Sequence, residues 1–198
     1  MRILLTGFEP FGGETINPSW QAVQSVAGRG CFADVHTVLL PTEYYRSVSV
    51  AVAAIDDLSP DIVLSVGQAG GRTAVSFERV AVNIVDSDVP DNAGNVFHTV
   101  NCFGGKDQLF STLPLDEMVE KVRRNGLPAY VSENAGRFVC NHVFYGILKH
   151  IAERGLNVKA GFCHVPYIPE QTTDKPFKPS MSLDNITDSI VAALAVLI

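Results

Sequence analysis

The sequence lacks long apolar runs, a dense set of cysteines and any block of positive charge. No segment of the 198-residue chain reaches the roughly eighteen consecutive apolar residues that a membrane-spanning helix needs. The first apolar run is too short for a signal peptide, and no small-residue cleavage site follows it. A net charge of −6 without a basic cluster lacks the electrostatic pattern of a nucleic-acid binder. We therefore expect a cytoplasmic protein with a small or neutral ligand.

The cysteines are few, and their spacing fits no disulfide framework. They are Cys31, Cys102, Cys140 and Cys163. In a reducing compartment we expect free thiols, which are then available for chemistry. Apolar residues make up 46% of the chain, which at this length is enough for one hydrophobic core. The sequence therefore predicts a single domain over residues 1–198.

Short apolar runs that end at glycine or proline predict buried strands at residues 2–8, 35–41 and 61–67. The segment 42–60 between the second and third runs is long enough for a helix, and Pro60 ends it. A strand, a helix and a strand in this order are typical of a parallel crossover. The pattern predicts an α/β fold with helices on both faces of a sheet.

Further elements are expected along the rest of the chain, namely strands at 76–85, 129–132 and 158–169, and helices at 114–126, 137–155 and 182–198. Ser182 or Asp184 is the expected cap of the last helix, and Gly155 the expected end of the helix before it. The stretch 86–108, rich in Asp, Asn and Gly, is expected to be a long irregular loop. Such loops are often functional.

One cysteine lies at the start of the helix predicted over 137–155. Helical spacing puts Cys140 on the same face as Phe144, Ile147 and Ile151, which is typical of a buried core cysteine. The first turn of a helix also favours a thiolate, through the helix dipole and unpaired N–H groups, and these groups can stabilise an oxyanion. Cys140 is therefore either a core residue or a nucleophile.

A nucleophilic cysteine needs a base within reach. His142 is only two residues from Cys140 and points away from it on a helix. His164 lies near the end of a predicted strand, where a side chain can project into a crevice at the sheet edge. We take His164 as the candidate base, although a histidine in a strand is more often structural.

A base in turn needs an orienting partner, usually a carboxylate. Alternation in the predicted strand 76–85 puts Glu78 on the same face as Val80, Val82 and Ile84, while Arg79 points to the opposite face. A carboxylate on an apolar face needs a partner. The partner of Glu78 is either some arginine, in a structural salt bridge, or an imidazole.

Two other kinds of site are weaker interpretations. Cys140, His142, Cys163 and His164 offer two sulfur and two nitrogen ligands for zinc, but the members of each pair point apart. The glycine-rich segment 66–72 lacks both nucleotide-binding motifs, G-x-G-x-x-G and G-K-[ST]. Its glycines are more simply explained by a turn or by close approach of the backbone to a ligand.

Four segments, in the order in which they occur, resemble the pyrrolidone-carboxylate peptidases (pyroglutamyl peptidase type I): LLTGFEPFGGETINPSW, VGQAGGRTAVSFERVAVN, AGRFVCNHVFYG and GFCHVPYIPEQ. The resemblance covers nearly the whole chain. It implies a three-layer α/β/α domain with a twisted, mixed and mostly parallel sheet. It also implies a cytoplasmic cysteine peptidase, a homodimer or homotetramer, that removes N-terminal pyroglutamate from peptides without a cofactor or metal. The family's nucleophile, base and orienting carboxylate fall on Cys140, His164 and Glu78.

The resemblance also implies a set of substrate-binding residues, namely Phe8, Phe11, Asn17, Thr42, Gln68, Val89 and Phe138, with Val89 in place of the usual isoleucine. Pyroglutamate is a flat lactam with no free amine. It needs apolar walls and partners for its ring N–H and C=O groups rather than an acidic anchor. From the residues alone, Phe8 and Phe11 are expected in a turn, either lining a pocket or packed in the core.

One position departs from the family pattern in a way that bears on activity. Asp88, in the segment DSDVP (86–90), stands where the family usually has an arginine. A carboxylate near the site would disfavour a thiolate or an oxyanion. The stretch 95–111 also departs from that pattern. Besides a peptidase, the sequence therefore leaves open a catalytically impaired binder of pyroglutamyl ligands.

Overall fold

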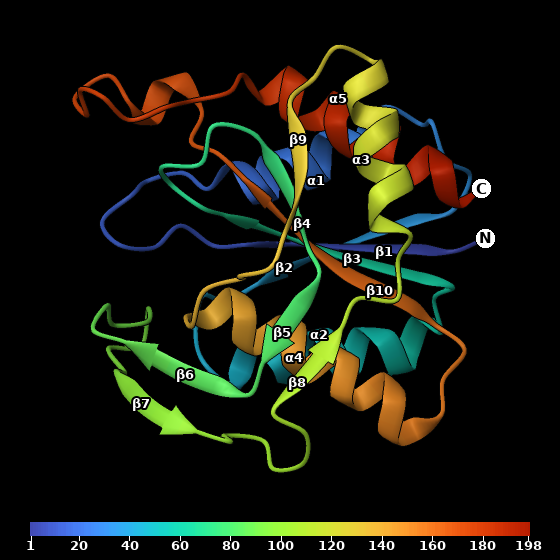
Figure 1. Cartoon of the computed structure of the whole chain (residues 1–198), viewed down its shortest axis with the longest axis vertical. Coiled ribbons are helices and arrows are strands. Elements are labelled where there is room, and N and C mark those ends of the chain that lie inside the picture. The colour runs from blue at the N-terminus through green and yellow to red at the C-terminus, as the bar shows by residue number, and fades with distance from the viewer.

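The computed structural model describes residues 1–198 and is built on a central sheet of six strands, in the order β2-β1-β3-β10-β4-β9 (Figure 1). These strands are β1 (Ile3–Phe8), β2 (Val35–Leu40), β3 (Ile62–Gln68), β4 (Val75–Glu78), β9 (Ala129–Ser132) and β10 (Lys159–Val165). Strands β2, β1, β3 and β10 pair in parallel, β4 runs antiparallel to β10, and β9 is parallel to β4. The predicted mixed, mostly parallel sheet is confirmed.

Five helices cover the two sides of this sheet: α1 (Pro18–Gly28), α2 (Arg46–Leu58), α3 (Leu115–Arg124), α4 (Val139–Arg154) and α5 (Leu183–Leu194). Figure 1 shows α1, α3 and α5 on one side and α2 and α4 on the other, which gives the three layers of an α/β/α domain. None of these helices has both the length and the apolar character needed to span a membrane.

Helix α1 was not predicted, although its signals are in the sequence. Asn17 caps it, with Oδ1 accepting a hydrogen bond from the backbone N–H of Ser19 at 3.0 Å, and Pro18 is its first residue. Ala22, Val23 and Val26 are buried at helical spacing. The four helices that were predicted, α2, α3, α4 and α5, are confirmed. Ser182 caps α5, and Gly155 ends α4 in a left-handed conformation.

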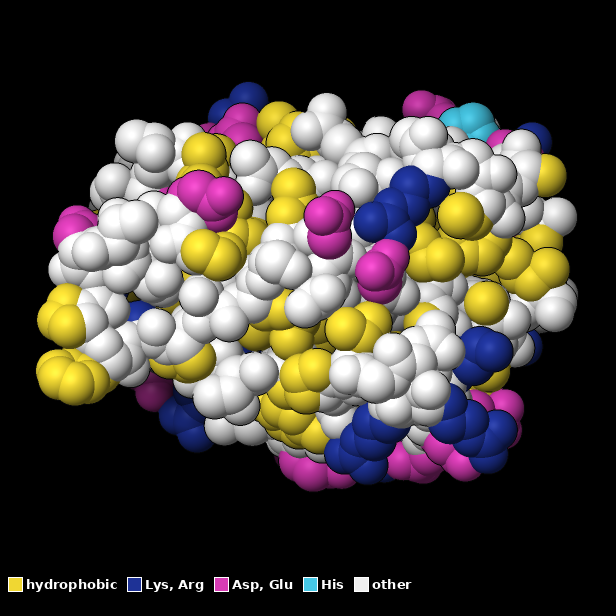
Figure 2. Space-filling view, turned by 90° about the horizontal axis from the view of Figure 1, so that it is seen from above, with side chains coloured by type: hydrophobic (Ala, Val, Ile, Leu, Met, Phe, Trp, Pro, Cys, Tyr) yellow, Lys and Arg dark blue, Asp and Glu magenta, His cyan; other side chains and the backbone are white.

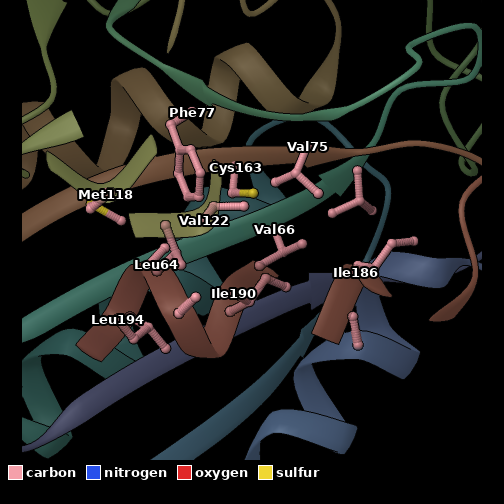
Figure 3. Close-up of a cluster of buried hydrophobic side chains, with 14 of the residues drawn as sticks. Leu64, Val66, Val75, Phe77, Met118, Val122, Cys163, Ile186, Ile190 and Leu194 are labelled. Carbon is pink, nitrogen blue, oxygen red and sulfur yellow. The ribbon is translucent and has the colours of Figure 1, made fainter. Parts of the chain in front are cut away.

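The side of the sheet under α1, α3 and α5, which we call the apolar face, is packed with hydrophobic side chains (Figure 3). The labelled residues come from the strands (Leu64, Val66, Val75, Phe77, Cys163), from α3 (Met118, Val122) and from α5 (Ile186, Ile190, Leu194). Figure 2, viewed from above Figure 1, shows the outer surface on this side, where hydrophobic atoms lie among side chains of both charges. The helices shield this core from water.

The opposite side of the sheet, which we call the α4 face, lies under α2 and α4. It has its own apolar cluster, which includes Phe144, Ile147 and Phe162. Successive side chains of a strand point to opposite faces. Phe77 and Cys163 therefore belong to the apolar face, whereas their neighbours Glu78 and His164 are buried on the α4 face.

The segment 76–85 is not the single strand that was predicted. It is divided into β4, β5 (Val80–Val82) and β6 (Ile84–Ser87). Strand β5 pairs with β8 (Gln108–Phe110), and β6 pairs with β7 (Phe97–Val100). Asn83 separates β5 from β6. Its Nδ2 donates to Asn101 Oδ1 at 2.6 Å and to the Gly104 carbonyl at 3.1 Å. The face predicted for Glu78 with Val80, Val82 and Ile84 was therefore wrong.

Two further expectations were wrong in detail. The stretch 86–108 is not irregular throughout, since it contains β7, and Asp91 orders the loop before that strand. The Asp91 carboxylate accepts hydrogen bonds from the backbone N–H groups of Tyr44, Ala93 and Asn95 at 2.8–3.0 Å. Phe8 is the last residue of β1 and lies in the core, so only Phe11 lies in the turn expected for both.

Candidate active site

Cys140 is the second residue of α4 and is partly buried. Gly136, with φ of 81°, turns the chain before the helix. Phe138 precedes the first helical residue and forms no capping hydrogen bond through its side chain. The first N–H groups of a helix have no partner within it, so these groups remain beside the thiol without a side-chain cap.

The sulfur of Cys140 lies against the sheet at Gly67. A Cβ atom added to Gly67 would be 2.8 Å from Cys140 Sγ and 2.9 Å from Cζ of Phe162, so only glycine leaves room for the thiol. In the register of β3 and β10, Gly67 is paired with His164. Because paired strands lie about 4.8 Å apart, the Cys140 sulfur and the His164 side chain lie on the same face of the sheet over neighbouring strands, with no hydrogen bond between them.

The imidazole of His164 is oriented by Glu78. Its Nδ1 lies 2.8 Å from Glu78 Oε1, and the Glu78 side chain is 0% exposed. Burial lowers the pKa of His164, and its hydrogen bond to Glu78 opposes that shift. The imidazole is therefore neutral near pH 7, and a hydrogen at Nδ1 donated to Glu78 leaves Nε2 free to accept a proton.

The second kind of partner considered for Glu78, an arginine, is also present. Arg72 Nη1 lies 2.6 Å from Glu78 Oε1 and contacts the hydroxyl of Ser76, and Nη2 donates to the Asn134 carbonyl at 3.0 Å. Sequence reasoning missed Arg72, which lies in the glycine-rich segment. The only signal was that a buried carboxylate needs a cation nearby. Glu78 thus has both the imidazole and the guanidinium at one oxygen atom.

The environment of Cys140 favours the neutral thiol. Burial raises the pKa of Cys140 to about 12, the charge of Glu78 raises it too, and the charge of Arg72 lowers it. At neutral pH a nucleophilic sulfur therefore has to be formed by proton transfer to a base.

The other members of the proposed zinc set do not join Cys140. Cys163 belongs to the apolar face. The His142 ring lies 4.4 Å from that of Phe103, and its Nδ1 lies 4.0 Å from Cys102 Sγ. Burial lowers the pKa of His142 to about 4. No group of three or more His, Cys, Asp or Glu residues is arranged to hold a metal ion.

The residues expected to bind substrate lie in different surroundings. The rings of Phe11 and Phe138 are 5.8 Å apart, next to the start of α4. Thr42 Oγ1 and Asn17 Nδ2 both donate to the carbonyl of Glu9, at 2.9 and 3.0 Å, and so fix the loop after β1. These contacts hold the Phe11 loop beside the helix that carries Cys140.

The remaining three expected residues are placed less uniformly. Phe8 packs in the core, with its ring 6.2 Å from that of Phe162. Gln68, at the end of β3, accepts a hydrogen bond from Gln171 Nε2 at 2.8 Å. Val89 is exposed in the loop after β6. The structure therefore brings Phe11 and Phe138 together but leaves Val89 in contact with solvent.

Comparison with known proteins gives this arrangement a family. The model of the pyroglutamyl peptidase family matches residues 1–198. The chain belongs to the pyroglutamyl peptidase family. It is therefore a hydrolase of the cysteine peptidase class, and homology and fold together indicate pyroglutamyl peptidase activity.

Similar proteins within the family match over nearly their full length. A pyrrolidone-carboxylate peptidase of Thermoanaerobacter sp. (strain X514) is 43% identical over 100% of this chain and 98% of its own. One from Ralstonia nicotianae is 46% identical over 97% of this chain and 90% of its own. The crystal structure of Bacillus amyloliquefaciens pyroglutamyl peptidase I is 44% identical, with a TM-score of 0.91, and covers 97% of this chain and 94% of that one.

The Asp88 carboxylate, expected from the sequence to disfavour a thiolate near the site, is instead turned to solvent. Its side chain is 99% exposed and lies 3.6 Å from Nε2 of His98. Water screens a charge so exposed. The electrostatic penalty expected from the sequence is therefore smaller than that of a buried carboxylate.

Proposed function

We propose that this chain hydrolyses the bond after an N-terminal pyroglutamyl residue through a thioester on Cys140. The observation that carries the proposal is the buried contact of 2.8 Å between His164 Nδ1 and Glu78 Oε1. It lies on the sheet face where Cys140 Sγ covers Gly67, the strand partner of His164. A thiol, an imidazole and an orienting carboxylate in this order make up a nucleophile, its base and the support of that base.

The acylation step uses these groups in turn. His164 Nε2 takes the proton of the Cys140 thiol as the sulfur attacks the pyroglutamyl carbonyl carbon. The uncapped N–H groups at the start of α4 stabilise the resulting oxyanion. The C–N bond then breaks, the leaving amine takes the proton from His164, and a thioester remains on the sulfur.

Deacylation reverses these roles. His164 accepts a proton from water, the oxygen of that water attacks the thioester carbon, and the thiol leaves with its proton restored. Glu78 stabilises the imidazolium formed in both steps. Arg72 Nη1, 2.6 Å from Glu78 Oε1, holds that carboxylate in place beside the imidazole. A neutral thiol and a neutral imidazole in the free enzyme fit general-base catalysis.

Two substrates and one reagent test this proposal. Reduced protein should release the amine from an L-pyroglutamyl amide and not from the L-prolyl amide, and a thiol alkylator should abolish the release. Cys140→Ser should remain folded and lose at least about 10³-fold in kcat/KM. Cys31→Ser removes an exposed thiol and should keep both the activity and its sensitivity to alkylation.

Two outcomes would contradict the proposal. Wild-type activity in Cys140→Ser would remove the nucleophile assignment. No release from folded, reduced wild-type protein would favour the alternative, a binder of pyroglutamyl ligands. Assembly as a homodimer or homotetramer in the cytoplasm stays a prediction from the resemblance, which light scattering on the purified chain checks for the oligomer.

A further inference from the structure

Tyr44 carries a buried hydroxyl that nothing in the protein satisfies. Tyr44 lies in the loop between β2 and α2 and is 4% exposed, and its hydroxyl oxygen has no hydrogen-bond partner. The side chain of Ser87 lies near enough to lower the pKa of Tyr44, while Ser87 Oγ accepts a hydrogen bond from the backbone N–H of Val89 at 3.1 Å. A buried hydroxyl without a hydrogen-bond partner lowers the stability of the fold, so we expect a bound ligand to supply that partner.

The ring of Tyr44 is held firmly from several sides. It meets the ring of Phe138 edge-on at 5.5 Å and that of Phe97 edge-on at 5.2 Å. Its backbone N–H donates to Asp91 Oδ2 at 3.0 Å. The position of the hydroxyl is therefore fixed before any ligand arrives, which lowers the entropic cost of binding.

The ring of Tyr44 packs against the residue that leads into the helix of the proposed nucleophile. Phe138 directly precedes α4, and Cys140 is two residues further along. Burial raises the pKa of Tyr44, and the charges of Asp91 and Cys140 raise it further. The phenol stays protonated at every working pH and can donate a hydrogen bond.

We propose that the Tyr44 hydroxyl donates a hydrogen bond to the lactam carbonyl of the pyroglutamyl ring bound against Cys140. This inference rests on the proposed function and adds a residue that sets specificity within the same site. Four buried side-chain atoms lack a partner, on Gln21, Tyr44, Glu78 and His142, and that of Tyr44 is the only hydroxyl. It lies against Phe138, the aromatic wall expected for the ring.

The lactam carbonyl is the group that a prolyl residue lacks. A site that offers a buried donor rejects a ligand without the matching acceptor far more strongly than an apolar wall can reject a ligand by shape. The N–H groups at the start of α4 already serve the scissile carbonyl in the proposed mechanism. The Tyr44 hydroxyl therefore remains as a donor for the lactam carbonyl of the pyroglutamyl ring.

The variant Tyr44→Phe tests the hydrogen bond, because it removes one oxygen and keeps the ring. We expect kcat/KM for the L-pyroglutamyl amide to fall about 10- to 100-fold. Affinity for 2-pyrrolidone, the lactam ring alone, should fall in parallel, measured by calorimetry on the unmodified thiol. The matched control is Tyr45→Phe, because Tyr45 is 44% exposed and its hydroxyl is not among the unpaired buried atoms. It should match wild type in both measurements.

The unfolding temperature separates recognition from a structural role. Tyr44→Phe should unfold at or above the wild-type temperature, since it loses an unpaired buried polar atom. Unchanged kcat/KM and unchanged 2-pyrrolidone affinity in Tyr44→Phe would overturn the inference. If wild type binds 2-pyrrolidone but releases no amine, the proposed function fails while the binding comparison still decides on Tyr44.

Discussion

The two faces of the sheet are built from the same strands and each has an apolar cluster, but only the α4 face also holds the buried Glu78 and His164. Strands β4 and β10 direct Phe77 and Cys163 into the apolar face and the adjacent Glu78 and His164 onto the α4 face. The apolar face is closed by three helices and packs as an ordinary core. On the α4 face, the same strands carry Glu78 and His164, which are hydrogen-bonded to each other, and Arg72 contacts Glu78. Adjacent residues of one strand thus divide between the packed core and the proposed catalytic group, because successive side chains point to opposite faces.

Cys140 and Cys163, one on each face, show the same contrast between the two faces. Burial is the largest cause of a raised pKa for both Cys140 and Cys163. Cys163 is fully buried among apolar side chains, whereas Cys140 shares its face with an imidazole. In the mechanism that we propose, the reactivity of Cys140 therefore comes from its neighbours. A low pKa of the free thiol is not required when a base is in place.

The largest effect is expected from Glu78→Gln on the α4 face. The amide keeps the volume but cannot stabilise the imidazolium, so kcat/KM should fall about 10²- to 10⁴-fold. Circular dichroism should show a folded protein. Glu133→Gln is the matched control, because Glu133 is exposed and pairs with Arg79, and it should match wild type. An unfolded Glu78→Gln would instead give Glu78 and Arg72 a purely structural role.

The next effect concerns His142, which is buried on the α4 face without a reactive partner. Its pKa is about 4 in the folded protein against 6.5 normally. Below pH 6.5 the unfolded chain takes up a proton that the folded one does not, so stability falls as the pH drops from about 6.5 to about 4. The total loss is roughly 3 kcal/mol. Urea unfolding of wild type and His142→Phe at pH 7 and pH 5 samples about 2 kcal/mol of this loss.

The variant decides what that measurement means. His142→Phe keeps the aromatic contacts with Phe103 and Tyr45 and removes the titrating group. Its stability should therefore depend less on pH than that of wild type over this range. Equal slopes for the two proteins would show that other groups, among them His164, carry the acid sensitivity.

The smallest effect is expected on the apolar face. Cys163→Ala leaves a small cavity among well-packed side chains and should lower the free energy of unfolding by about 1 kcal/mol. Its kcat/KM for the L-pyroglutamyl amide should equal that of wild type. A large loss of activity with little loss of stability would break the contrast between the two faces, because Cys163 would then act on the chemistry.

Much of this fold is predictable because its strands and helices follow the local spacing of apolar residues. Apolar runs located β1, β2 and β3, and the positions of Gly155 and Ser182 marked helix ends. Alternation failed between residues 76 and 85, where the hydrogen bonds of Asn83 to a distant loop override the strand pattern. Helix α1 was not predicted, although its cap and its apolar spacing are both present in the sequence.

The candidate site divides in the same way. Cys140 and His164 were found from their places at the ends of predicted elements, and Glu78 from the need of a buried carboxylate for a partner. Arg72 and Tyr44 were not found. Their contacts join segments far apart in the chain, such as Arg72 with Asn134 and Tyr44 with Phe138. No local pattern contains such contacts.

Gly67 has one further consequence. The space available to the Cys140 sulfur is limited by main-chain atoms of β3, a strand inside the sheet with neighbours on both sides. Main chain in such a position fluctuates far less than surface side chains. The proposed nucleophile is therefore positioned by main chain inside the sheet, and we expect little substrate binding energy to be needed to order it before attack.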